Sequence, residues 1–273
     1  MRDLFTLFED NIAFIDYSSE ARDYLRDSFQ IDYVQADGDA IYLGLYKPYR
    51  QLFVELDTVA VANTGSITFE YWNGSSFASL SVIDESKNFT RNGFIKFDAP
   101  SDWSVSTINN EELYWIKITN DVDFDITFKG LNTVFSDDTD LKSENRTIDD
   151  LLAVGDSSFI SYHVAARNEI VQSLRNGGHT TRVSGGKVDK DLTKWDFLIP
   201  EQIRNASKYL TLSKIMFDVS SNVDDKWYSR FKDYRDMYSE AFKLYLMAID
   251  ENDDGEASSV EQNNFRTVTL QKV

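Results

Sequence analysis

The hydrophobic period of this chain changes partway along its length, from two residues to 3.6. Between Ile41 and about Val134, apolar residues alternate with polar ones in short runs separated by turn residues, a pattern typical of β-strands. From Phe159 onward, apolar residues recur every three or four positions, which is typical of helices that bury one face. We therefore predict an α+β protein of two domains: an N-terminal antiparallel β-sandwich in residues 1–140, and a C-terminal helical bundle with a terminal β-strand in residues 141–273.

The predicted strands of the sandwich lie between turn signals. Asn73-Gly74 is the strongest of these signals, and it predicts a hairpin that joins a strand at Ile67–Tyr71 to one at about Phe77–Val82. Five further strands are predicted from short apolar runs, at Ile41–Tyr46, Gln51–Leu56, Gly93–Phe97, Leu113–Thr119 and Ile126–Asn132. This spacing of short strands favours a sandwich. The polar, acidic segment Ser136–Glu144 then marks the expected domain boundary.

Three tryptophans in this region, Trp72, Trp103 and Trp115, allow two interpretations. Aromatic residues favour strands and fill sandwich cores, which makes a core position the preferred interpretation for Trp103 and Trp115. Alternatively, the three rings form an exposed platform that stacks on sugar rings, and the chain is then a carbohydrate-binding or host-adhesion module. A glycan array separates the two interpretations, because a purely structural protein has no saccharide preference.

Three helices are predicted in the second half from the spacing of their apolar residues. The first carries the stripe Phe159, His163, Ala166, Ile170 and Leu174, and it ends at Gly177-Gly178. The second begins near Pro200 and is expected to bury Ile203, Ala206, Leu210 and Phe217. The third carries the longest stripe, formed by Trp227, Phe231, Tyr234, Tyr238, Phe242, Tyr245 and Ile249.

This third helix has a second apolar line, formed by Met237, Ala241, Leu244 and Ala248. A bundle of three helices covers one broad apolar face of each helix, but it has little surface left to cover another. The second line therefore favours an oligomer.

The sequence offers few candidates for catalysis. The chain has no cysteine and two histidines, His163 and His179, so the usual nucleophile and base pairs are scarce. His163 lies on an apolar stripe, where a packed core histidine is the preferred interpretation over a catalytic or metal-binding one. We expect no enzymatic activity. A glycosidase remains a rival hypothesis, because its two carboxylates need a defined separation in space rather than in sequence.

A calcium-loop pattern follows the third helix. Residues Asp250 to Glu261 match the EF-hand loop D-x-[DN]-x-[DN]-G-x₅-E at every position. Calcium would be bound by the side chains of Asp250, Asn252, Asp254 and Glu261, at positions 1, 3, 5 and 12 of the loop. The backbone carbonyl of Glu256 at position 7 would also bind the ion, and Ser258 at position 9 would bind it through water.

The surroundings of this loop argue against a calcium sensor. The loop has no second copy, and the alternating residues Arg266–Val273 take the place of an exit helix, whereas sensors work by moving paired helices. Two interpretations stay open. In the first, a structural calcium ion binds the loop and stabilises the end of the helix. In the second, the segment is an acidic turn without metal, in which Gly255 ends the helix.

Calorimetric titration distinguishes these two interpretations. If calcium staples the loop, the wild-type protein is expected to bind it, and Glu261→Gln is expected to weaken that binding because it removes the bidentate carboxylate. Equal heats for the two proteins, or no heat at all, would favour the bare turn.

The charge of the chain limits its partners. Against 46 acidic residues stand 28 basic ones, a formal charge of −18. Such a charge opposes tight binding to nucleic acid and adhesion to anionic membranes, although it suits a surface past which DNA slides without sticking. The sequence also predicts no membrane-spanning stretch, and the acids among its first ten residues argue against a secretory segment.

Two parts of the sequence resemble virion proteins of tailed bacteriophages. The stretches Ile41–Tyr49, Phe69–Phe77, Pro100–Trp103 and Tyr114–Ile118 resemble β-sandwich domains that recur in these proteins. The second half is similar to head–tail connector (adaptor) proteins of the phage neck. That similarity rests on helix order and pattern, in Ile148–Leu152, Ala165–Ile170, Ala206–Leu210 and Trp227–Ile249.

The resemblance implies a structural role in the virion, in the neck or tail region, with assembly in the bacterial cytoplasm. Connector proteins form rings, typically of about twelve subunits (dodecamers), that bind the portal and the tail or neck proteins and let DNA pass without sequence-specific contacts. It also makes the C-terminal strand a candidate for pairing with a neighbouring subunit, through Arg266, Val268, Leu270 and Val273. The alternative location is a collar, tail or baseplate component whose sandwich binds carbohydrate.

Overall fold

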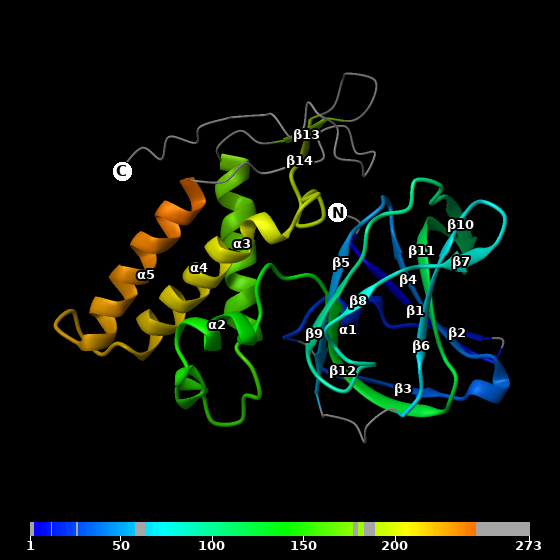
Figure 1. Ribbon diagram of the computed structural model, residues 1–273, viewed down its shortest axis with the longest axis horizontal. Coiled ribbons are helices and arrows are strands. Elements are labelled where there is room, and N and C mark those ends of the chain that lie inside the picture. Colours follow the sequence, from blue (N-terminus) through cyan, green and yellow to red (C-terminus); the bar gives the residue numbers. More distant parts are fainter. Residues whose placement is uncertain are drawn as a thin grey trace. The chain divides into compact units, whose positions relative to one another are not determined.

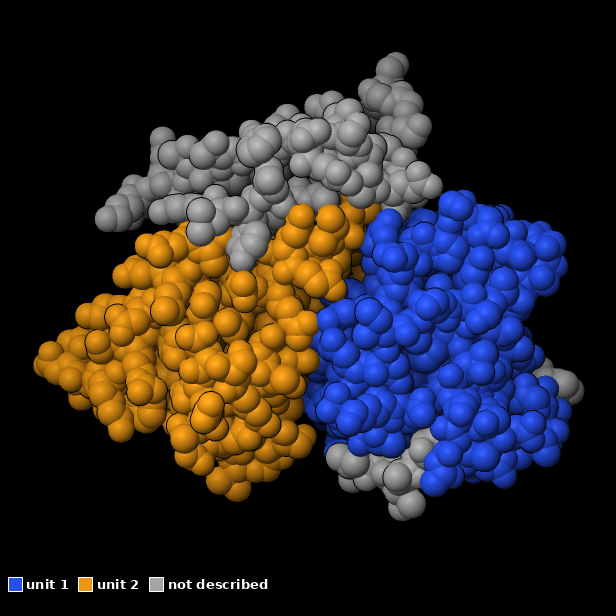
Figure 2. All heavy atoms as spheres, in the orientation of Figure 1, with its two compact units in different colours: residues 1–133 blue, residues 134–273 orange. Residues whose placement is uncertain are grey.

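The computed structural model describes residues 3–11, 13–25, 27–57, 64–176, 180–182 and 189–243. The chain forms two compact units, residues 1–133 and 134–273, which Figure 2 distinguishes by colour. The first unit is built of antiparallel strands and the second of helices, which confirms the α+β two-domain fold (Figure 1). The units divide at residues 133/134, ahead of the predicted boundary at 140/141, because Phe135 already belongs to the helical core.

The first unit contains two antiparallel sheets. The seven-stranded sheet has the order β2-β1-β4-β11-β6-β7, with β10 paired to β11. Its strands are β1 (Phe5–Asp10), β2 (Ala13–Asp16), β4 (Ala40–Leu45), β6 (Ile67–Trp72), β7 (Phe77–Ser79), β10 (Val105–Ile108) and β11 (Glu111–Asn120). The five-stranded sheet has the order β3-β12-β5-β9-β8, formed by β3 (Phe29–Tyr33), β5 (Gln51–Leu56), β8 (Ile83–Asp84), β9 (Gly93–Lys96) and β12 (Phe124–Asn132). A short helix, α1 (Ser18–Ala21), and a 3₁₀ turn, η1 (Gln35–Asp37), lie between strands.

Each of the seven predicted strands is present, and β5 has the predicted bounds, whereas β7 ends at Ser79 instead of Val82. The sandwich begins well before Ile41, however, because β1 and β3 belong to it. In β1, the consecutive residues Thr6, Leu7 and Phe8 are all buried. A strand that is covered on both faces does not alternate, so it has no period-two signal by which it could be predicted.

The centre of the seven-stranded sheet depends on a close contact between two strands. Every residue of β4 is buried, and β4 pairs with β11 so that Gly44 lies opposite Trp115. A Cβ atom at position 44 would lie 2.4 Å from the Trp115 ring. Glycine is therefore required here because the indole occupies the space that a side chain would need.

The second unit begins with short helical elements and continues with longer helices. Its elements are α2 (Asp138–Glu144), η2 (Ile148–Leu151), α3 (Ile160–Asn176), β13 (Thr180–Arg182), β14 (Asp189–Asp191), α4 (Glu201–Val219) and α5 (Lys226–Lys243). The three predicted helices are confirmed as α3, α4 and the described part of α5. The predicted continuation of the third helix to Ile249 lies outside the described residues. Within the described residues, no helix combines the length and the apolar character needed to cross a membrane.

Among the described residues, the predicted stripes of α3 and α4 are buried except at Phe217, and Trp227, Phe231 and Tyr234 of α5 are partly buried. Ala166, Ile170 and Leu174 of α3 pack with Leu210 of α4 and Tyr238 of α5, among others. Phe217 was predicted to be buried, and this is wrong, since 54% of it is exposed.

The reason lies in the last turns of α4. These turns bury Leu212, Ile215 and Met216 in a second cluster, against which Trp227 and Phe231 of α5 pack. The buried face therefore turns away from Phe217. On the second apolar line of α5, Ala241 is buried and Met237 is 42% exposed, while Leu244 and Ala248 lie outside the described residues.

Candidate functional site

The predicted calcium ligands lie outside the described residues. This applies to the whole loop, with Asp250, Asn252, Asp254, Glu256, Ser258 and Glu261, and to the candidate partner-binding residues Arg266, Val268, Leu270 and Val273. His179 also lies outside them. In the ranges that the structure covers, no three or more acidic, histidine or cysteine side chains are grouped so that they could hold a metal ion.

The three tryptophans do not form a platform. Trp115 is 0% exposed, and its indole N–H donates a hydrogen bond to the Ser106 carbonyl at 2.9 Å. Trp103 is 6% exposed and packs against Tyr49, with ring centroids 5.2 Å apart. The sugar-stacking interpretation is therefore wrong for Trp103 and Trp115, because neither ring presents a face to solvent. Trp72 is half-buried, with its ring edge-on to Phe77.

His163 lies in a buried hydrogen-bond network. Its Nε2 is 3.1 Å from Asp138 Oδ1 and its Nδ1 is 3.0 Å from Ser136 Oγ, which in turn is 2.8 Å from Ser207 Oγ. A carboxylate only accepts hydrogen bonds, so in the neutral imidazole Nε2 carries the proton and Nδ1 accepts from Ser136. The network connects the start of α2 to α3 and α4.

Ser136, His163 and Asp138 lie within hydrogen-bonding distance of one another in series, as in a hydrolase triad, but the serine and the histidine are buried in the protein. Ser136 is 0% exposed and His163 is 1% exposed. A substrate carbonyl must approach the serine oxygen to be attacked, and here no path leads to it. His163 is therefore a packed core histidine with both ring nitrogens hydrogen-bonded, which is the preferred interpretation of its position on the apolar stripe.

The acidic segment before α2 is a structural element of the helical unit. The Asp137 side chain accepts a hydrogen bond from the Asp140 N–H, and the Asp140 side chain accepts one from the Asp137 N–H, which forms a capping box. Arg204 of α4 donates from Nε to Asp140 at 2.9 Å. Burial and the nearby Asp140 charge raise the pKa of Asp137. These acids fix the start of α2 instead of separating two domains.

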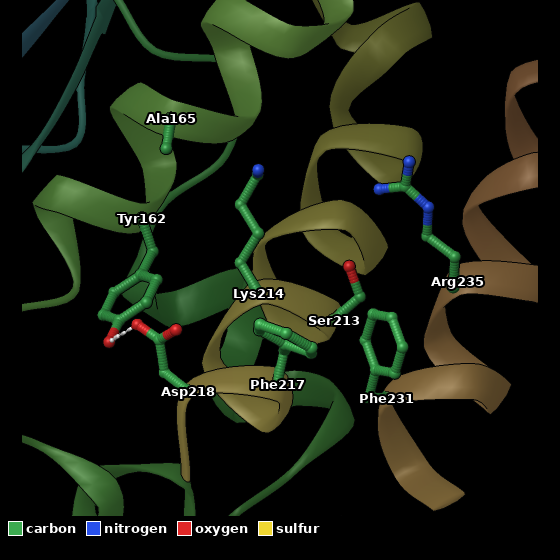
Figure 3. A pocket seen from close by; sticks show the side chains of 8 residues that line it. All are labelled: Tyr162, Ala165, Ser213, Lys214, Phe217, Asp218, Phe231 and Arg235. Atoms are coloured by element: carbon green, nitrogen blue, oxygen red, sulfur yellow. Dashed lines mark hydrogen bonds between the residues drawn. The ribbon is translucent and has the colours of Figure 1, made fainter. Parts of the chain in front are cut away.

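A groove of about 490 Å³ lies between α3, α4 and α5 (Figure 3). Phe217 and Phe231 form its apolar floor, with ring centroids 5.2 Å apart. The remaining lining residues come from all three helices: Tyr162 and Ala165 from α3, Ser213, Lys214 and Asp218 from α4, and Arg235 from α5.

The charges above this floor are paired with one another through Glu169 of α3. Lys214 Nζ lies 2.6 Å from one Glu169 carboxylate oxygen, and Arg235 Nη2 lies 2.8 Å from the other. Partial burial favours the neutral acid, but the Lys214 hydrogen bond and the Arg235 charge outweigh it and lower the pKa of Glu169. This one carboxylate therefore joins α3 to both α4 and α5.

The other polar groups of the groove are also engaged. Tyr162 donates its hydroxyl proton to Asp218 at 2.8 Å, and burial followed by this hydrogen bond raises the pKa of Tyr162 to about 12. Ser213 Oγ donates to the Leu210 carbonyl at 2.7 Å. At neutral pH the phenol thus remains a donor, and the Ser213 hydroxyl donates to a backbone carbonyl and not to a base. These features suit a binding surface better than a reaction centre.

The groove continues toward the connection between α4 and α5. A second hollow of about 380 Å³ shares Phe217 and Asp218 with the first, and its wall includes Val223 and Tyr228. Val223 is 67% exposed. We call the two hollows together the α4–α5 groove. Sequence reasoning missed it because Phe217 has the spacing of a core residue, and the exposed Val223 in the polar turn after α4 was the one available signal.

Comparison with known proteins yields no relative from which a role could be transferred. No protein-family model matches the chain, and no curated protein matches it.

Proposed function

We propose that this chain is a non-enzymatic structural subunit of a tailed-phage particle, which forms a homo-oligomeric neck ring between the portal and the tail. The observation that carries the proposal is the α4–α5 groove, with an aromatic floor that solvent reaches at Phe217. Exposed aromatic surface bordered by polar groups is typical of places where another protein docks.

The electrostatics of the groove support docking of an apolar partner surface. Lys214 and Arg235 both contact the Glu169 carboxylate, and Asp218 accepts a hydrogen bond from Tyr162. A partner that covers the aromatic floor therefore leaves each of these charged groups with the hydrogen-bond partner that it already has, which limits the cost of burying ionic groups in an interface. The energy of such contacts comes mostly from a few aromatic anchors.

Other features of the chain agree with this role. The net charge of −18 suits a ring through which DNA passes without adhering. The sandwich would serve as a docking or decorating module of the ring. The helix order resembles that of neck connectors, and a collar, tail or baseplate position is the alternative within the same particle. The carbohydrate-binding alternative is weakened by the burial of Trp103 and Trp115.

Electron microscopy tests the proposal. Purified protein is expected to form closed rings, and labelled antibody is expected to mark the neck of virions that contain the chain. A monodisperse monomer that is absent from particles would contradict the proposal.

A substitution in the groove tests the observation behind it. Phe217→Asp is expected to abolish ring formation, measured by light scattering after size exclusion, because it places a charge on the apolar floor. Its free energy of unfolding should change by about 1 kcal/mol or less, since Phe217 is more than half exposed. Val154→Asp is the matched control at a fully exposed valine outside the groove. Normal rings from Phe217→Asp would show that docking uses another surface.

A further inference from the structure

One edge of the sandwich is suited to receive an additional strand. β3 forms the edge of the five-stranded sheet and pairs with β12 from Phe29↔Phe128 to Tyr33↔Phe124. Among the described strands, none pairs with its other side. An edge strand presents backbone N–H and C=O groups that can bind another extended segment.

The other edge strands of the two sheets are shorter than β3 and would bury less apolar surface against an added strand. β8 has two residues and β7 has three, while β2 and β10 have four each, none of them buried. β3 has five residues, and Phe29, Ile31 and Tyr33 are buried while the two residues between them are exposed. A strand added beside β3 would therefore extend an existing apolar layer, whereas one added beside β2 would bury little.

Acidic residues lie at both ends of β3 and on its outer face. At its start, Asp57 accepts a hydrogen bond from the Ser28 hydroxyl, and beyond its end Asp123 accepts one from the Gln35 N–H. On its outer face lie Asp32 and Asp125, both exposed. These acids disfavour an acidic strand at this edge and favour a basic one.

The C-terminal segment of the chain has the complementary sequence. Residues Arg266–Val273 contain two bases and no acid, in a chain with 46 acids. In an extended segment Val268 and Leu270 would fall on one face, and Arg266 and Lys272 would lie at the two ends of that same face. An apolar centre with a base at each end matches an apolar edge strand with an acid at each end, Asp57 and Asp123.

We propose that the β3 edge binds the segment Arg266–Val273 of a second copy as an added strand. The inference rests on the proposed ring function and names a second contact between neighbouring copies, besides the α4–α5 groove. Each subunit offers one β3 edge and one C-terminal segment, so the contact is heterologous. Contacts of this kind close into a ring when the rotation between copies allows it.

Site-directed cross-linking tests this contact, since the chain has no cysteine of its own. Gln30→Cys places a thiol on the exposed face of β3, and Thr269→Cys places one on the outward face of the added segment. The two full-length single variants are mixed in equal amounts and treated with a short bismaleimide, which tolerates a register difference that a disulfide does not. Cross-linked dimers are identified by mass spectrometry.

The expected result is a heterodimer that contains one Gln30→Cys chain and one Thr269→Cys chain. Its yield should exceed that of the matched control by about tenfold or more, because docking raises the local thiol concentration. The control pairs Thr269→Cys with Ser79→Cys, an exposed position on the β7 edge. Arg266→Glu combined with Lys272→Glu in the Thr269→Cys chain should reduce the heterodimer to the control level.

The remaining outcomes overturn the inference or separate it from the proposed function. Cross-linking within a single chain carrying both cysteines, without a heterodimer, would show that each segment binds its own sandwich. Rings in the microscope without any Gln30–Thr269 product would refute the β3 contact and leave the ring proposal standing. A heterodimer without rings would support the contact and count against the ring.

Discussion

Trp115→Ala is expected to lower the free energy of unfolding of the sandwich unit by about 3–5 kcal/mol. Trp115 is 0% exposed, and it packs in a cluster with Leu7, Tyr42 and Leu113. The substitution removes the largest side chain of this cluster, leaves a cavity, and frees the Ser106 carbonyl from its hydrogen bond. Urea denaturation followed by circular dichroism measures the change. Trp72→Ala, at a half-buried tryptophan of β6, is the control and should cost clearly less.

Gly44 provides a sharper form of the same experiment. Gly44→Ala alone should cost about 1–3 kcal/mol, because its Cβ would lie within 2.4 Å of the Trp115 ring. In the Trp115→Ala background that ring is absent, so Gly44→Ala should change the free energy of unfolding very little. The two changes should therefore be strongly non-additive in a double-mutant cycle. Additive effects would mean that the strand, and not the indole, excludes a side chain at this position.

His163→Leu is expected to destabilise the helical unit. The leucine fills a similar volume, but it removes the imidazole acceptor of the Ser136 hydroxyl, which keeps Ser207 Oγ at 2.8 Å, and the imidazole donor to Asp138. Each group that loses its partner costs about 1–3 kcal/mol. Water can reach Asp138, whose side chain is 23% exposed, and the Ser136 hydroxyl can turn to Ser207 Oγ, so each loss should fall toward the lower end of this range. Thermal and urea unfolding measure the change.

Tyr162→Phe is the control for this prediction on the same helix. It removes one hydrogen bond, to Asp218 at the surface of the groove, and should cost about 0.5–1.5 kcal/mol. Wild-type stability in His163→Leu would show that the buried network contributes nothing to the fold. Loss of a measurable hydrolase activity in that variant, with an intact fold, would contradict the assignment of His163 as a core residue.

Local sequence patterns were sufficient where an element buries one face. The alternation in β6 and the Asn73-Gly74 turn placed a hairpin between Ile67 and Ser79, which the structure confirms. The stripes in α3 and α5 likewise placed two helices, because a helix with one buried face repeats its apolar residues every 3.6 positions. β1 escaped detection since neighbours cover it on both faces, and its sequence carries no alternation.

The candidate sites could be predicted less completely than the fold. Whether Trp115 stacks on a sugar or fills a core depends on what covers it, and that is a property of the assembled sheet and not of the residues around it in the chain. His163 was assigned to the core by its stripe, but its partners Ser136, Asp138 and Ser207 come from segments far apart in sequence. Hydrogen-bond networks of this kind leave no periodic signal.

The sequence by itself determined the order of the two units, because hydrophobic periods of two and 3.6 are local consequences of strand and helix geometry. It also determined the charge that limits the partners of the chain. The tertiary structure alone decided which face of each element is covered. Phe217 has the spacing of a core residue, yet the last turns of α4 bury Ile215 and Met216 instead. Packing against α5 thereby turned an expected core residue into the floor of the α4–α5 groove.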